Sequence, residues 1–193
     1  MRPGQIVVLN GAPRSGKSSI ARVIQETFDG PWMDLGVDVF VREITPPRYR
    51  PGVGLRPGDD LPDLRALVPA LYDAMFASIA AHSRAALNVV ADVGLYDPAV
   101  IARCHAILEG LPVLWVGVRC PIDVIMRRRN AGQRGREGEY ATGAPHDPIP
   151  APVMRWQDEV HQHLRYDLDV DTSGSTPEEC ASRIRGALSV RDG

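Results

Sequence analysis

The chain has 193 residues, 44% of them hydrophobic and 24% charged, with a formal net charge of −2. This composition is typical of one globular domain with a full core, and the near-neutral charge gives no general attraction for nucleic acid or anionic membranes. Since no apolar run approaches the roughly 20 residues that cross a bilayer and no signal-peptide core is visible, we expect a single cytoplasmic domain over residues 1–193 without nucleic-acid or membrane partners.

Strand and helix patterns alternate along the whole chain. In order, we expect a strand at 5–10, a helix at 18–28, a strand at 32–37, a helix at 63–85, a strand at 87–92, a helix at 98–109, a strand at 113–118, helices at 122–129 and 151–164, a strand at 168–171 and a last helix from Pro177. Thr176 and Glu179 form a capping box at the start of that last helix. The alternation predicts an α/β fold, a parallel sheet flanked by helices on both faces, with functional residues at the carboxyl ends of the strands.

The first loop fits the pattern G-x-x-x-x-G-K-[ST]. In this pattern backbone N–H groups surround phosphate oxygens, and the hydroxyl after the lysine binds Mg²⁺. A buried strand precedes the loop and a helix follows it, so the positive end of the helix points at bound phosphates. We therefore predict a nucleotide site rather than an ordinary Gly-rich turn. Its residues are Gly11, Ala12, Pro13, Arg14, Ser15, Gly16, Lys17, Ser18 and Ser19.

Lys17 is the one lysine among 22 basic residues other than histidine. A compact ammonium on a flexible stem reaches between the β- and γ-phosphates of a nucleotide, where the planar fork of arginine fits poorly. The chain uses arginine at every other basic position, so the lysine at this place supports the phosphate site. We expect Lys17 to act directly in phosphoryl transfer.

Asp92 closes an apolar run and is a candidate metal ligand. A carboxylate at the end of a buried strand is the usual second partner of the loop hydroxyl around Mg²⁺, so we expect Ser18 and Asp92 to serve the metal together. An aspartate in this position is also a common turn or capping residue.

Asp38 is a candidate general base. Phosphoryl transfer to an alcohol benefits from a carboxylate that accepts the hydroxyl proton. Gly36 allows close backbone approach, and Arg42 would lie one helical turn further on. The competing interpretation is that Asp38 caps a helix starting at Val39.

Five arginines cluster between 127 and 136, in a segment rich in glycine. We interpret residues 127–148 as a lid that closes over the phosphates, with Arg128 binding the nucleotide and Arg134 acting in catalysis. The alternative is a solvated helix end. No aromatic residues are interleaved with these arginines, which argues against a nucleic-acid surface.

These motifs resemble the chloramphenicol phosphotransferases of antibiotic-producing actinomycetes. The likeness covers most of the chain, and it rests on residues 8–18, 31–32 and 36–38, 92–93, 113–120, 166–167 and 170–172. It implies a P-loop kinase fold with a five-stranded parallel sheet and ATP-dependent phosphorylation of an antibiotic hydroxyl. It also implies that Asp38 is the general base and that Asp171 and Thr172 approach the adenine.

Two segments depart from that family. Arg14 places a bulky cation in a loop where the family has small residues, and residues 45–62 do not follow the family closely. We expect the acceptor to bind within residues 38–75. Arg48, Arg50 and Arg56 leave open a metabolite kinase of the shikimate or gluconate type, whose acceptors carry carboxylates.

A further alternative is a nucleotide-binding regulatory module without a catalysed transfer. The leading hypothesis is a small-molecule O-phosphotransferase that uses ATP and Mg²⁺ on a hydroxyl acceptor, chloramphenicol or a related compound. The long helix at 63–85 would allow a homo-oligomer.

Overall fold

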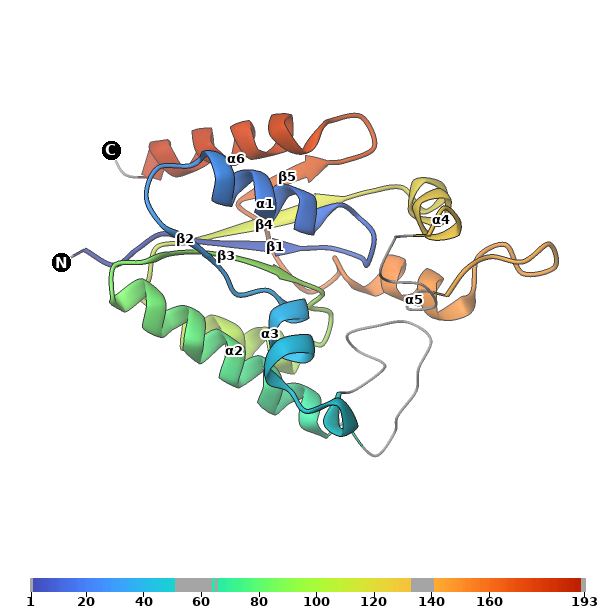
Figure 1. Cartoon of the computed structure of the whole chain (residues 1–193), viewed down its shortest axis with the longest axis horizontal. Coiled ribbons are helices and arrows are strands. Elements are labelled where there is room, and N and C mark those ends of the chain that lie inside the picture. The colour runs from blue at the N-terminus through green and yellow to red at the C-terminus, as the bar shows by residue number, and fades with distance from the viewer. Residues whose placement is uncertain (1, 51–63, 65, 133–140, 192–193) are drawn as a thin grey trace.

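A five-stranded parallel sheet forms the centre of the molecule. The computed structural model describes residues 2–50, 64, 66–132 and 141–191 (Figure 1). The strand order is β2-β3-β1-β4-β5, and every neighbouring pair is parallel. The bounds are β1 Ile6–Asn10, β2 Trp32–Asp34, β3 Asn88–Val93, β4 Val113–Arg119 and β5 Leu168–Asp171. The predicted fold class is confirmed.

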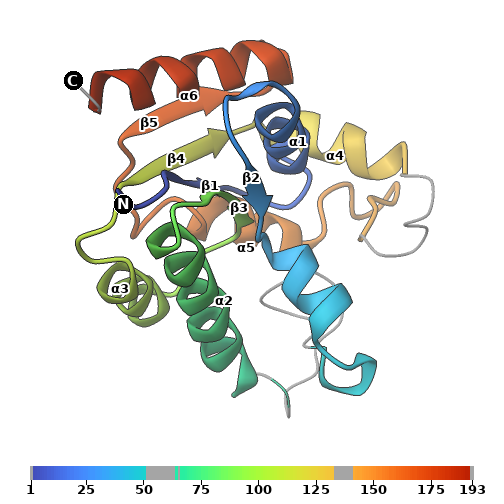
Figure 2. The same cartoon turned by 60° about the vertical axis from the view of Figure 1, so that its left-hand side comes forward.

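Helices cover both faces of the sheet. Two views place α1 (Lys17–Thr27) and α6 (Pro177–Arg191) on one face, and α2 (Leu67–Arg84) and α3 (Pro98–Ile107) on the other (Figures 1 and 2). α4 (Ile122–Asn130) and α5 (Ala151–Glu159) lie beyond the carboxyl ends of the strands. These ends therefore face a space bounded by helices and loops.

The apolar core divides along the two faces of β1. Successive side chains of a strand point to opposite faces, so Ile6 and Val8 pack with Phe76 of α2, while Val7 and Leu9 pack on the side of α1 and α6. All four β1 side chains are fully buried. Burial on both faces explains why the strand is a continuous apolar run, as is typical of parallel sheets.

The segment after β2 differs from the expectation. The predicted strand at 32–37 ends at Asp34, because the Asp34 carboxylate accepts a hydrogen bond from Gly36 N at 3.1 Å and the chain turns. One wide helical segment, η1 (Val39–Ile44), follows, then a single short turn, η2 (Pro47–Tyr49). The sequence left open a helix starting at Val39, which is where η1 begins, but it did not predict η2. Thr45 N closes η1 on Phe40 O, five residues back, a π-type bond that periodicity does not reveal.

The last helix begins with the predicted capping box. Glu179 N donates to Thr176 Oγ1 at 3.2 Å, and Thr176 N donates to Glu179 Oε2 at 2.8 Å. The reciprocal bonds satisfy two backbone donors at the start of α6.

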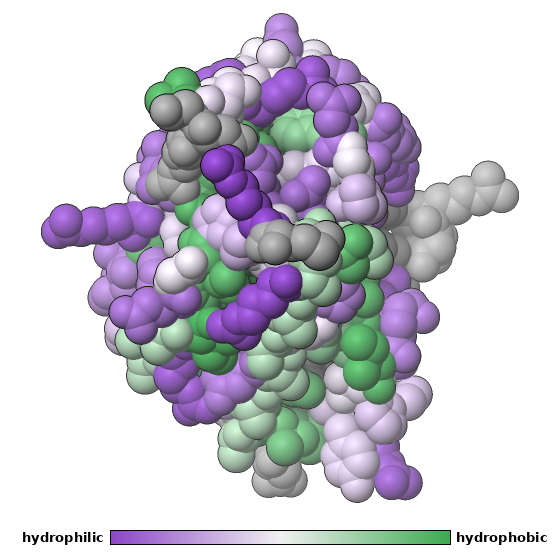
Figure 3. All heavy atoms as spheres, turned by 90° about the vertical axis from the view of Figure 1, so that its left-hand side faces the viewer, coloured by the Kyte–Doolittle hydropathy of each residue, from purple (hydrophilic) through white to green (hydrophobic). Residues whose placement is uncertain are grey.

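Both termini lie at the end of the molecule that is on the left in Figure 1. Figure 3 shows this end face-on, and hydrophilic and hydrophobic residues are interspersed on it in small patches. None of the helices in the described part of the chain is long and apolar enough to span a membrane.

Candidate active site

The loop between β1 and α1 has the tight backbone that phosphate binding requires. Gly16 has a φ of +100° and Arg14 a φ of +72°, both in the left-handed region. Glycine is needed at position 16 for this conformation, whereas a Cβ there would make only ordinary contact with the Thr172 side chain, at 3.4 Å. Ser15 Oγ is buried without a hydrogen-bond partner in the described part of the chain. A buried donor of this kind fits a loop that receives a phosphate group.

Lys17 lies over this loop. Its Nζ donates to Gly11 O at 2.8 Å and to Ala12 O at 2.9 Å. Burial lowers the pKa of the Lys17 ammonium to about 8, and the nearby Asp92 and Asp38 carboxylates oppose this shift. An incoming phosphate would replace two neutral carbonyl acceptors with a charged one, which is a stronger hydrogen-bond partner. The Lys17 ammonium therefore lies where it could reach a phosphate bound in this loop.

Ser18 and Asp92 meet across the site, 74 residues apart in the sequence. Ser18 Oγ donates to Asp92 Oδ2 at 2.5 Å. Gly36 lies against the same carboxylate, since a Cβ at this position would come within 2.0 Å of Asp92 Oδ1. In the described ranges no three His, Cys, Asp or Glu side chains form a metal cage. One hydroxyl and one carboxylate fit Mg²⁺, which usually keeps water and phosphate ligands.

Asp34 belongs to the same group, and the sequence interpretation missed it. This half-buried residue ends β2, and its pKa is raised by burial and by the neighbouring Asp92 and Asp38 charges. Its signal in the sequence is the one that identified Asp92, an aspartate at the end of a short strand. Asp34 therefore lies close to the two carboxylates, Asp92 and Asp38, that act on the Lys17 ammonium.

Asp38 precedes η1 but does not cap it. Its side chain makes no capping hydrogen bond to the backbone, and its Oδ1 lies 4.0 Å from Arg42 Nε. The capping interpretation is therefore not supported. The side chain retains 37% of its solvent exposure, which leaves the carboxylate accessible to an acceptor.

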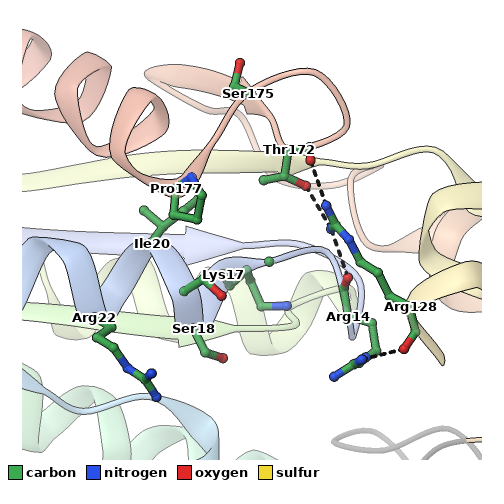
Figure 4. A pocket seen from close by; sticks show the side chains of 11 residues that line it. Arg14, Lys17, Ser18, Ile20, Arg22, Arg128, Thr172, Ser175 and Pro177 are labelled. Atoms are coloured by element: carbon green, nitrogen blue, oxygen red, sulfur yellow. Dashed lines mark hydrogen bonds between the residues drawn. The ribbon is translucent and has the colours of Figure 1, made fainter. Parts of the chain in front are cut away.

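Arg14 and Arg128 connect three segments around the loop (Figure 4). Arg14 donates to the main-chain carbonyl of Arg128, and Arg128 Nη1 donates to Arg14 O at 3.3 Å. Arg128 Nη2 also donates to Thr172 O at 2.7 Å, and Thr172 Oγ1 donates to Ser15 O at 2.5 Å. These partners are neutral, so both arginines bring positive charge to the rim of the phosphate loop.

A cavity of about 430 Å³ opens beside the loop (Figure 4). It is lined by seven predicted residues, Arg14, Gly16, Lys17, Ser18, Ser19, Arg128 and Thr172, and also by Ile20, Arg22, Ser175 and Pro177. Gly11, Ala12, Pro13 and Ser15 belong to the loop itself and do not line this cavity. Ser175 and Pro177 were not predicted, and their signal in the sequence is their place between a strand end and a capping box.

Asp171 lies outside the lining of this cavity. Its Oδ1 accepts hydrogen bonds from Ser173 Oγ and Ser173 N, both at 2.7 Å, and these bonds lower the pKa of the carboxyl. The side chain thus orders the loop after β5. Its neighbour Thr172 provides the contact with the phosphate loop.

The lid prediction is described only at its base. Arg129 is 1% exposed and donates from Nη1 to Ala141 O at 3.1 Å, and Asn130 Oδ1 accepts from Gly143 N at 3.0 Å. These bonds hold the start and the end of the segment together. Arg134 lies outside the described residues, as do 51–63 within the predicted acceptor region 38–75.

Several known proteins with a similar chain or fold are named as kinases or phosphotransferases. Two Mycobacterium tuberculosis proteins, from strains CDC 1551 / Oshkosh and ATCC 25618 / H37Rv and each named "Putative O-phosphotransferase", are 23% identical over 197 residues, covering 95% of this chain and 82% of theirs. A sugar kinase from Janibacter sp. HTCC2649 superposes with a TM-score of 0.66 at 19% identity, covering 97% of this chain and 96% of its own.

The fold also matches a kinase solved with ligands. The APS kinase of Mycobacterium tuberculosis, in complex with AMPPNP and APS, superposes with a TM-score of 0.59 at 16% identity, covering 98% of this chain and 99% of its own. The family model described as chloramphenicol phosphotransferase-like protein matches residues 4–189. The chain is therefore a kinase that belongs to the chloramphenicol phosphotransferase-like family.

Proposed function

We propose that this kinase transfers the γ-phosphoryl group of ATP to a hydroxyl of a small molecule, with chloramphenicol or a related antibiotic as the first candidate. One observation carries the proposal: Lys17, the Ser18–Asp92 pair and Asp38 converge from the start of α1, from β3 and from the segment after β2. The first three residues form a nucleotide and metal site. The fourth adds an accessible carboxylate that a purely nucleotide-binding module would not need.

Each residue has a separate role in this proposal. Lys17 holds the β- and γ-phosphate oxygens, and its positive charge stabilises the negative charge that moves during transfer. Ser18 and Asp92 would hold Mg²⁺, which neutralises phosphate charge when it is bound. Arg14 and Arg128 add positive charge at the rim, as would the predicted Arg134.

Asp38 accepts the proton of the acceptor hydroxyl. Its carboxylate is accessible, and it lies close enough to Lys17 to affect the pKa of the ammonium. A base in this position orients the attacking oxygen and removes its proton as the new O–P bond forms. Thr172 and its neighbours on the loop after β5 would bound the adenine side.

The arginines that supported a carboxylate-bearing acceptor have other contacts. Arg50 Nε donates to Thr45 O at 2.9 Å and its Nη2 donates to Arg42 O, so the guanidinium fastens its own segment. Arg48 lies over the ring of Tyr49, 4.8 Å from its centroid. Arg56 lies outside the described residues. This use of Arg50 favours an antibiotic-like acceptor over a sugar acid or shikimate.

A direct assay tests the proposal. ADP formation from ATP and Mg²⁺ is measured alone and with chloramphenicol, shikimate or gluconate, and the products are analysed by mass spectrometry for one added phosphoryl group. We expect ADP formation to depend on the antibiotic and to match the phosphorylated product in amount. Slow ADP formation that no acceptor stimulates would contradict the proposal and favour a regulatory module.

A further inference from the structure

A second cavity, of about 320 Å³, lies at the carboxyl end of β3. It is enclosed by the first turns of α2, the loop after β3, the start of α3 and one side of α5. Its walls are largely apolar or aromatic, formed by Val68, Pro69, Tyr72, Leu95, Tyr96 and Val100. This size and lining fit the ring of a small organic molecule.

The cavity adjoins the phosphoryl-transfer site. Gly94 lines it two residues after Asp92, and a Cβ at Gly94 would lie 3.8 Å from Gly11 O, the carbonyl that accepts from Lys17. Tyr72 is 5% exposed, and its hydroxyl has one long hydrogen bond, to Gly94 O at 3.4 Å. Leu95, which also lines the cavity, is hydrogen-bonded through its main chain to Asn10, the residue before Gly11. A molecule in this cavity would therefore lie beside the strand end that carries Asp92, and Tyr72 would offer it a polar contact.

The far end of the cavity is acidic. Glu159 is half-buried, and its side chain has no hydrogen-bond or ion-pair partner in the part of the chain that the structure describes. It also lines an adjoining open hollow, together with Asp147 and Asp158. Arg155 lies at the same end, but its side chain is exposed and its charge is better screened by water.

A half-buried carboxylate without a partner favours a cation. An ammonium group placed there would form a charge-assisted hydrogen bond with Glu159, in a space where water screens the charges less than at the surface. A carboxylate in the same place would be repelled. The apolar walls and the acidic end together describe a molecule with a ring at one end and an amine at the other.

We propose that this cavity binds the acceptor, and that the preferred acceptor is an alcohol with an apolar ring and a protonated amine that Glu159 binds. The inference rests on the proposed function. In the transfer, the acceptor oxygen gives its proton to Asp38 and forms a bond to the γ-phosphorus, while the bond from that phosphorus to the bridging oxygen breaks and ADP leaves with the electron pair.

A matched pair of acceptors tests the amine preference. Chloramphenicol has an acylated nitrogen, and removal of the acyl group gives the free amine of the same nitrophenyl diol. We expect kcat/KM at pH 7 to be about tenfold higher for the amine, because one ion pair in a partly desolvated site is worth about that factor. Glu159→Gln should abolish the preference. Asp158→Asn, a neighbouring change at an exposed residue that does not line the inner cavity, should retain it.

Affinity measurements separate this inference from the proposed function. Calorimetry gives the affinity of both compounds in the presence of AMPPNP and Mg²⁺, so it needs no turnover. If the protein binds the amine more tightly than chloramphenicol, loses this difference in Glu159→Gln and phosphorylates neither compound, the cavity assignment is supported and the proposed function is contradicted. Turnover with equal or better use of chloramphenicol, or no binding of either compound, would overturn the inference.

A separate variant tests whether the acceptor binds in this cavity. Val68 is half-buried in the first turn of α2, and Val68→Trp would fill the cavity without touching the phosphate loop. We expect the affinity for both compounds to fall at least tenfold while AMPPNP affinity stays within about twofold. Unchanged acceptor affinity in this variant would place the acceptor elsewhere.

Discussion

Asn10 is the residue through which the phosphate loop and the acceptor cavity are joined. It is fully buried at the end of β1. Its Oδ1 accepts from Leu95 N at 2.6 Å. Its Nδ2, which has two hydrogens to donate, lies within hydrogen-bond distance of three oxygens: Leu95 O at 3.2 Å, Val160 O at 2.9 Å and Tyr166 Oη at 2.8 Å. One side chain therefore holds the loop after β3, the end of α5 and the segment before β5 in fixed positions. Asn10→Ala removes all four contacts.

The expected cost of Asn10→Ala follows from the groups left behind. Val160 O retains a hydrogen bond from Tyr166 Oη at 3.3 Å, but Leu95 N and Leu95 O lose the side chain that binds them. Leu95 is 1% exposed, so water does not readily replace that partner. Each unsatisfied buried group costs about 1–3 kcal/mol, so we expect a loss of about 3 kcal/mol in the free energy of unfolding. For a chain of this size the Tm should fall by about 6–12 °C.

Urea and thermal unfolding measure this loss. Ser189→Ala is the control, because its exposed hydroxyl makes only a local bond to Arg185 O at 3.1 Å, and it should change stability by less than about 0.5 kcal/mol. Because Leu95 lines the cavity, the acceptor KM should also rise in Asn10→Ala while AMPPNP affinity changes less. An Asn10→Ala protein within about 1 kcal/mol of the wild type would refute the reasoning.

Three other changes give separate tests. Gly36→Ala would drive a Cβ to 2.0 Å from Asp92 Oδ1 and displace that carboxylate, so we expect acceptor phosphorylation to fall about 100-fold, and near-normal rates would contradict the assigned role of Asp92. Gly186→Ala, in α6 with no atom within 4 Å of the added Cβ, should raise stability by about 0.5–1 kcal/mol in urea unfolding, and a loss would contradict the helix assignment. Burial lowers the pKa of Lys17 to about 8 from an ordinary value of 10.5, so the unfolded state binds more protons between these values and stability should rise with pH there. ATP affinity should fall above about pH 8, by at most about tenfold per pH unit, as the ammonium loses its proton. Lys17→Met should remove the pH dependence of stability and that of ATP affinity. A wild-type ATP affinity that does not change with pH would contradict the role of the ammonium.

The sequence predicted the features that local pattern determines. The five strands and the capping box of α6 depend on neighbouring residues, and the structure confirms them. It also brings Ser18 and Asp92 into contact. Parallel strands bring their carboxyl ends to one edge of the sheet, so strand ends gave a sound guide to the site. The same rule, applied to a second strand predicted to end at residue 37, selected Asp38, whereas β2 ends at Asp34.

Contacts between distant segments were not predictable in this way. Arg14 fastens the phosphate loop to the end of α4, although the loop alone suggested only a bulky substitution. Glu159 and Tyr72 line one cavity, yet they are far apart in the sequence and belong to different helices. No periodicity or motif marks them, because their meeting depends on how α2 and α5 pack around the end of β3.

The central claim, that Asp38 activates a hydroxyl for phosphoryl transfer, is tested most directly by Asp38→Asn. The change keeps the size of the side chain and removes the carboxylate. The rate of acceptor phosphorylation is measured in single turnover, together with AMPPNP affinity. We predict a 10²- to 10⁴-fold lower rate with nucleotide affinity within about twofold of the wild type. An unchanged rate of phosphorylation at unchanged affinity would contradict the account.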